Sequence, residues 1–243
     1  MNKPDMKNRK ENPILSLVFN IFIPVMILKN GEKWLLDYYH YFKLDIQSFT
    51  FLIALIFPFA YFVYDFINRK NINFISILGF VNVLLTGGIG IFGAKYGLTR
   101  ISFILKEGLM PLIIGLFLFF LSKLKKSSFH KIILNEALFN VEKIKTNQTD
   151  NQLTSLNKLI TVSGYYFIGG FFISSVIQFI LATLIVTSNP GESGFNEQVS
   201  TMTWVSYLAV LGPTIIVVGK GYFDLINGIE KLTGLSKEDF INS

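Results

Sequence analysis

The sequence predicts an all-α integral membrane protein, a bundle of six transmembrane helices with both termini in the cytoplasm. Its composition, its long apolar runs and its distribution of basic residues all lead there. Of the 243 residues, 51% are hydrophobic and 16% are charged, whereas an average soluble domain is about 25% charged. With a mean hydropathy of +0.49, the chain has more apolar surface than one soluble core can bury, so the lipid bilayer is its first expected partner.

Each predicted span is an apolar run close to the roughly 20 residues that cross a hydrocarbon layer. The apolar content is continuous, whereas the strands of a membrane barrel alternate in polarity, so the runs favour helices. The spans cover about 12–28, 46–67, 72–94, 101–122, 159–187 and 199–219.

The basic residues set the orientation. Sixteen of the 22 Lys and Arg residues fall in the amino-terminal segment and every second segment after it, and six fall in the alternate segments. Because cytoplasmic loops of membrane proteins carry excess Lys and Arg, both termini are predicted to be cytoplasmic. The net charge of +6 is assigned to the membrane surface, with no nucleic acid as partner.

Three segments outside the spans have recognisable patterns. Apolar residues at helical spacing, Ile133, Ala137, Val141 and Ile144, predict an amphipathic helix in the cytoplasmic segment 123–158, between spans four and five. In the cytoplasmic tail 220–243, the order Ser236-Lys237-Glu238-Asp239 is typical of a helix start. The first outside loop holds aromatic residues that we expect at the headgroup level. They are Trp34, Tyr38, Tyr39, Tyr41 and Phe42.

Few residues could carry catalysis. The chain has no Cys and two His, which excludes a disulfide scaffold and a cysteine-ligated metal. We therefore expect no catalytic, cofactor or metal site, and no enzyme. An intramembrane enzyme is the third and last of the functions we consider, after the two given at the end of this section. It would need several converging catalytic groups, which Lys106 and Glu107 alone supply poorly.

The fourth span contains two charged residues. Lys106 lies six residues after Arg100, about 9 Å along a helix that starts there, and an ionisable group at such depth is a functional candidate. Alternatively, the helix starts later, Lys106 reaches back to the interface and Glu107 lies near the helix start. Because consecutive helical residues do not face each other, Lys106 and Glu107 are expected to find partners on other helices.

Small and polar side chains recur at four-residue steps on several spans, which indicates faces turned toward other helices. Together they could line a polar pocket or pathway; alternatively, they are packing seams with a few interhelical hydrogen bonds. The candidate intramembrane polar site consists of Lys106, Glu107, Asn20, Asn82, Thr86 and Gln178.

Several stretches resemble a known family. They are 12–15, 22–24, Pro58 with 64–66, 73–90, 106–111 and 195–197. Over nearly the whole chain the sequence resembles bacterial six-span inner-membrane proteins related to intracellular septation protein A. Thr86, Lys106 and Pro111 carry the most specific part, but Glu107 stands where septation protein A has proline, which points to a sister family. The resemblance implies a place in the bacterial inner membrane and a link to septation or envelope growth, and it transfers no catalytic residue.

Two functions follow as expectations. The first is a non-enzymatic structural or interaction role in the cell envelope, with envelope or division proteins as partners and with the cytoplasmic helix and the aromatic loop as contact surfaces. The alternative is a small secondary transporter or channel with its polar site around Lys106 and Glu107. A homodimer is a further expectation, since six spans are few for an alternating-access monomer.

Overall fold

The computed structural model describes residues 13–41, 44–69, 74–136, 138–146 and 148–242. The regular structure of these residues is helical, with one isolated antiparallel bridge between Phe139 and Ile241. The chain divides into two compact units. Unit 1 comprises Met1–Gly108 and Gln178–Leu208, and unit 2 comprises Leu109–Ile177 and Ala209–Ser243. Each is described by itself below.

Unit 1 begins with a helix that changes its winding. After α1 (Pro13–Leu17), one π-helical turn, η2 (Val18–Phe22), leads into α2 (Ile23–Trp34). The N–H group of Ile23 donates to the carbonyl oxygen of Val18 five residues earlier, and Pro24, which has no N–H group, follows at once. The wide turn therefore accommodates the proline without ending the helix.

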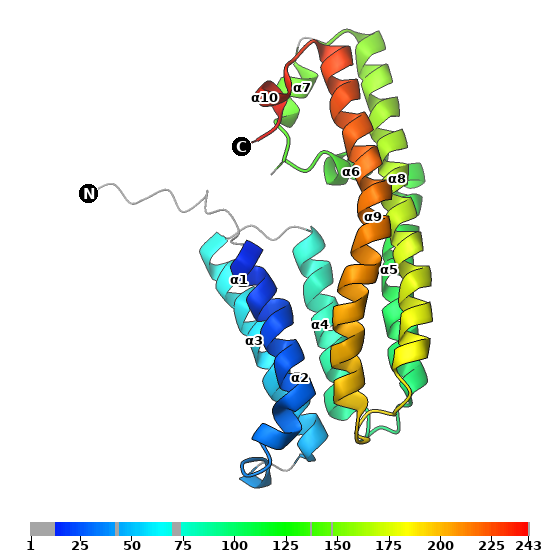
Figure 1. Ribbon diagram of the computed structural model, residues 1–243. Coiled ribbons are helices and arrows are strands. Elements are labelled where there is room, and N and C mark those ends of the chain that lie inside the picture. The colour runs from blue at the N-terminus through cyan, green and yellow to red at the C-terminus, as the bar shows by residue number, and fades with distance from the viewer. Residues whose placement is uncertain (1–12, 42–43, 70–73, 137, 147, 243) are drawn as a thin grey trace, which may run out of the picture. The chain divides into compact units, whose positions relative to one another are not determined.

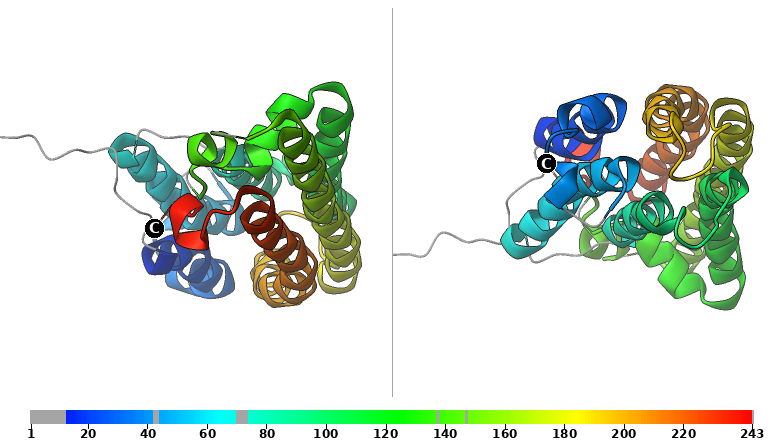
Figure 2. Two further views of the ribbon diagram at one scale, coloured as in Figure 1. Left: turned by 90° about the horizontal axis from the view of Figure 1, so that it is seen from above. Right: turned by 90° about the horizontal axis from the view of Figure 1, so that it is seen from below.

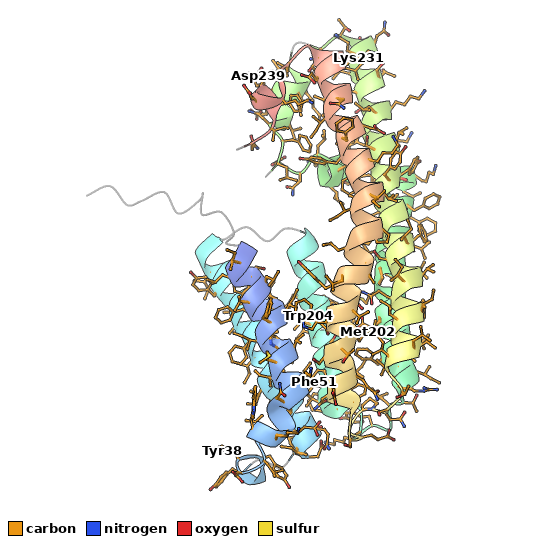
Figure 3. The ribbon with its side chains drawn as sticks, in the orientation of Figure 1. Tyr38, Phe51, Met202, Trp204, Lys231 and Asp239 are labelled. Carbon is orange, nitrogen blue, oxygen red and sulfur yellow. The ribbon has the colours of Figure 1, made fainter. Side chains whose placement is uncertain are left out.

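The remaining helices of unit 1 surround an aromatic core. A short turn, η3 (Tyr39–Tyr41), leads to α3 (Ile46–Arg69), which packs between α2 and α4 (Phe74–Phe92; Figure 1). Phe103, from α5 (Arg100–Leu124), meets Phe195 edge to face with ring centroids 5.7 Å apart, and Phe51 stacks on Phe195 from α3. Phe51 and Met202, labelled in Figure 3, are both buried in this core.

Buried hydroxyl groups join helices of unit 1. Ser48 donates a hydrogen bond of 3.0 Å to the carbonyl oxygen of Ile91 on α4, and Ser200 donates one of 3.0 Å to that of Val25 on α2. Both serines are at most 2% exposed. Because an unmet polar group costs most where water is absent, these bonds fix where the backbones meet.

Unit 2 is built on two long helices, α8 (Asp150–Ile185) and α9 (Phe195–Thr233), which run side by side in Figures 1 and 2. Small side chains allow the approach: Ser174 and Thr214 share a hydrogen bond of 3.2 Å, and Gly170 lies against Val218. The ring of Phe129, from α6 (Lys126–Ile133), is fully buried against Gly164 of α8.

The segment predicted as one amphipathic helix forms two short ones. After α6 the chain leaves helical conformation at Leu134, and α7 (Val141–Lys145) starts only after Asn140, whose side chain accepts from Lys143 N. The backbone between them instead pairs with the end of the chain, since Asn140 N donates to Phe240 and Asn242 N to Leu138. Ile133 and Ile144 are buried as their spacing indicates, and Ala137 lies outside the described residues.

The carboxyl-terminal end forms the helix that its sequence predicts. The last helix, α10 (Lys237–Phe240), starts with a capping box in which Ser236 and Asp239 each bond the other's backbone, and it packs against α7. The helix α9 continues to Thr233, beyond the residue 219 at which the sixth span was expected to end.

Among the residues that the structure describes, five helices are long and apolar enough to cross a membrane, as expected of a multi-pass membrane protein. They are Ile14–Trp34, Ile46–Ile67, Arg100–Leu124, Asp150–Ile185 and Phe195–Thr233. The predicted third span corresponds to α4, which contains a shorter apolar stretch, Phe80–Phe92.

Candidate functional site

An ion pair lies within the apolar helix α5. Lys106 Nζ is 2.7 Å from Glu107 Oε1, and the exposed fractions of the two side chains are 5% and 17%. The expectation that these neighbours would not pair with each other is therefore wrong: the long lysine stem lets the ammonium group turn toward the next residue. The alternative in which the helix starts after Lys106 is also wrong, because α5 starts at Arg100.

The ion pair is connected to a second helix through Thr86. Lys106 Nζ donates to Thr86 Oγ1 on α4 at 2.5 Å, and the same hydroxyl donates to the backbone oxygen of Asn82 at 2.9 Å. The ammonium group also lies 5.5 Å from the ring centroid of Phe103. A hydroxyl, a carboxylate and an aromatic face thus surround the lysine charge, which compensates for its removal from water.

A cavity of about 130 Å³ opens beside Thr86. Its polar lining comes from three parts of unit 1: Asn20 in η2, Asn82 and Thr86 on α4, and Thr203 on α9. The rest of the lining is apolar, and it consists of Pro24, Val25, Leu28, Phe51, Ala54, Leu55, Pro58, Val83 and Val199. An apolar cavity with a few converging polar groups is the usual form of a small-molecule site.

The polar groups of this cavity differ in their availability. Asn20 Nδ2 donates to Ser16 Oγ at 3.2 Å, and Thr203 Oγ1 donates to the backbone oxygen of Val199. Among the residues that the structure describes, nothing forms a hydrogen bond with the side-chain amide of Asn82. That amide has two donors and an acceptor to offer to a molecule in the cavity.

Gln178 lies apart from the other candidates. Its Oε1 accepts a hydrogen bond of 3.0 Å from Ser206 on α9, and it is not part of the cavity lining. The structure therefore brings Asn20, Asn82 and Thr86 to one cavity and attaches Lys106 and Glu107 to it through Thr86. Gln178 is an interhelical contact, which is the packing-seam alternative for this one residue.

Two residues of the site were not singled out from the sequence. Thr203 lines the cavity and Phe103 packs under the lysine charge. Thr203 is one of several hydroxyl residues in the last span, so its type alone carried no signal. Phe103 could have been found, because it precedes Lys106 by three residues and therefore shares its helix face.

Metal ligation has no candidate in the described ranges, where no three His, Cys, Asp or Glu side chains gather. Of the two histidines, His130 lies on α6 and its Nε2 is 2.8 Å from Thr161 Oγ1.

Comparisons with family models, with curated proteins and with solved structures find no match to this chain.

Proposed function

We propose that the chain is a small secondary transporter or channel of the bacterial inner membrane. The observation that carries this proposal is the ion pair of Lys106 and Glu107, which is nearly buried, lies on an apolar helix and is bonded through Thr86 to the wall of the mainly apolar cavity. Burying two charges is expensive, and ionisable residues inside spans commonly belong to ion or substrate pathways.

The arrangement can couple a proton to a solute. While Glu107 is ionised, it holds Lys106 Nζ together with Thr86. A proton on Glu107 would remove its negative charge and so weaken its hold on the ammonium group, which would then strengthen its bond with Thr86 or turn to an acceptor in the cavity. A small polar solute beside Thr86 would therefore sense the protonation of Glu107 through one hydrogen bond.

Charge movement on solid-supported membranes tests this proposal. Purified protein in liposomes is exposed to pH jumps and to a panel of common ions and metabolites. A transient current with wild type that is lost with Glu107→Gln would support coupled transport. Glu238→Gln, in the exposed helix α10, is the matched control and should keep the current. No current from wild type under any condition would contradict a proton-coupled transporter.

A second variant separates function from folding. Thr86→Val removes the hydroxyl that joins the ion pair to the cavity and keeps a β-branched side chain of similar volume. We expect normal insertion and yield, with the current reduced at least tenfold. Thr86→Ser keeps the hydroxyl and should restore most of the current, and a loss equal to that of valine would contradict the assigned role.

The topology is part of the proposal. We propose six spans, with α4 as the one added to the five long helices, and both termini in the cytoplasm. The 16 to 6 distribution of basic residues supports this orientation. Because the chain has no Cys, Ser127→Cys and Ser193→Cys each introduce one reactive thiol. A membrane-impermeant maleimide should label Cys at 193 from outside intact cells and Cys at 127 only after lysis; the reverse pattern would contradict the orientation.

A structural or interaction role in the cell envelope is the second candidate, and one observation favours it. The end of α2 and the following turn expose Trp34, Leu36, Tyr38 and Tyr41, of which Tyr41 is 84% exposed; Figure 3 labels Tyr38. Large apolar side chains at a membrane surface suit either headgroups or another protein. The resemblance to relatives of septation protein A makes division proteins the expected partners.

Complementation of a deletion strain distinguishes the two candidates. Tyr38→Ser/Tyr41→Ser should disturb cell length or septum placement if the surface recruits a partner, while Glu107→Gln should behave as wild type. The opposite result, a defect with Glu107→Gln alone, would contradict the envelope role and favour transport.

A further inference from the structure

A groove of about 560 Å³ lies within unit 2, where the start of α6 faces α8. It is separate from the cavity of unit 1 and plays no part in the proposed transport. Its lining combines cations, hydroxyl groups and an amide, and it consists of Lys126, Ser127, His130, Thr154, Asn157, Lys158, Thr161 and Val162.

The groove has the chemistry of an anion site. Lys126 and Lys158 approach it from two different helices, and its lining contains no Asp or Glu. Ser127 and Asn157 add neutral donors, whereas the hydroxyl of Thr154 donates to the backbone oxygen of Asp150 at 2.9 Å. Phosphate oxygens accept hydrogen bonds from such groups, and lysine binds phosphate as a point charge.

His130 lines this groove and also a neighbouring pocket of unit 2 that contains Glu136, Glu142, Lys131 and Lys145. Its Nε2 lies 2.8 Å from Thr161 Oγ1, and that hydroxyl gives its one hydrogen to the backbone oxygen of Asn157. The threonine oxygen must then accept, so Nε2 carries a hydrogen and protonation takes place at Nδ1. Burial lowers the pKa of His130, and Lys145 and Lys126 lower it further, against a contact with Asn157 that raises it.

The groove also lies at the level where apolar sequence ends. Lys126 follows the last apolar residues of α5, and Lys158 is the charged residue immediately before the uncharged run 159–191 of α8. Basic residues at that position face the headgroups of a bilayer, where anionic lipids concentrate.

We propose that this groove binds the phosphate group of an anionic phospholipid headgroup, with Lys126 and Lys158 as the two cationic contacts. The hydroxyl and amide groups of the lining orient the phosphate, and His130, which also lines the groove, senses it. Free phosphate has the same charged oxygens but no acyl chains. The experiment therefore compares inorganic phosphate with the lipid.

The experiment follows His130 by NMR in protein purified in a maltoside detergent. His40→Gln, with any affinity tag removed, leaves one imidazole in the chain. Short-chain phosphatidylglycerol, short-chain phosphatidylcholine and inorganic phosphate are each titrated into the sample. With phosphatidylglycerol we expect a saturable shift of the His130 resonances and a rise of its pKa, because a nearby anion stabilises the imidazolium.

The groove lysines are then removed. Each lysine near a membrane surface contributes about a fivefold effect on anionic lipid affinity, so Lys126→Gln/Lys158→Gln should bind phosphatidylglycerol about 25-fold more weakly. The control Lys33→Gln/Lys231→Gln changes the charge equally, away from the groove, and should stay within about twofold of wild type.

Four results would overturn the proposal. Absence of a saturable shift with phosphatidylglycerol, or unchanged affinity of the groove variant, would remove the site. Inorganic phosphate or phosphatidylcholine binding as tightly as phosphatidylglycerol would overturn the assignment to an anionic lipid. Loss of the transport current leaves this test unaffected, since the two sites share no residue.

Discussion

Lys106 Nζ lies 2.7 Å from Glu107 Oε1, although the two residues follow each other on α5. Successive side chains leave a helix about 100° apart, so the contact depends on the length of the lysine stem, which brings the ammonium group around to Thr86 and to the carboxylate together. The ion pair therefore presents one combined polar group to α4.

Removing one member of the Lys106–Glu107 ion pair should lower the free energy of unfolding more than replacing both members with apolar residues. Lys106→Met and Glu107→Leu each leave a buried charge without its partner, and each should lower the free energy of unfolding by about 3 kcal/mol. The double variant Lys106→Met/Glu107→Leu has no charge left and should lie within about 1 kcal/mol of wild type. Equilibrium unfolding in mixed micelles measures all three, and additive losses in the double variant would show that the charges do not interact.

The glycines of α4 should differ in their response to alanine. A Cβ at Gly90 would overlap the ring of Phe51, whereas a Cβ at Gly88 meets nothing within 4 Å. Gly90→Ala should destabilise the protein by about 1–3 kcal/mol through overpacking, and Gly88→Ala should stabilise the helix by up to about 1 kcal/mol. Thermal unfolding in detergent gives the comparison, and equal effects at the two positions would contradict the packing of α4 on α3.

Gln178 should be dispensable for transport. Its contact with Ser206 is one interhelical hydrogen bond, a type that contributes about 0.6 kcal/mol on average. We expect Gln178→Leu to change the free energy of unfolding by less than about 1 kcal/mol and to keep the transient current. A current lost from a well-folded Gln178→Leu protein would return this residue to the polar site.

The packing of α10 against α7 should weaken at low pH. A hydrogen bond from Lys143, helped by Ser236, lowers the pKa of Asp239 from 3.8 to about 2. The stabilising contribution of this carboxylate is complete above pH 3.8 and is lost as the pH falls through about 2. Hydrogen exchange measures this at the amide of Asn242, which bonds to Leu138. Its protection factor should fall as the pH is lowered through that window, and in Asp239→Asn the protection factor should not depend on pH there.

Apolar length predicted most of the helices, since a run of uncharged residues leaves the backbone few alternatives in lipid. The second span was expected at 46–67, and α3 covers Ile46–Arg69. Apolar length does not predict where a helix ends when the helix continues beyond its apolar run. Beyond Lys220, α9 continues because Lys220 pairs with Asp224, and because Leu225 and Ile229 are fully buried.

The sequence predicted which types of residue form the site, but not which of those residues contact one another. Four-residue steps on separate spans singled out Asn20, Asn82 and Thr86, and all three line the cavity. The sequence does not show which helices are neighbours, so it does not distinguish Gln178 from Asn20, Asn82 and Thr86. The contact between Lys106 and Glu107 was missed because a spacing rule describes where side chains start, whereas a lysine ammonium group ends several bonds away.

The pairing of Lys106 with Glu107 also determines how the site responds to membrane voltage. A lysine and a carboxylate held 2.7 Å apart have almost no net charge, so the transmembrane field exerts little force on them together. A proton on Glu107 would uncover one elementary charge, on which the field acts with about 2.3 kcal/mol per 100 mV for a full crossing. In the proposed transporter, the intact ion pair would thus be electrically silent, and a proton on Glu107 would make the site sensitive to voltage.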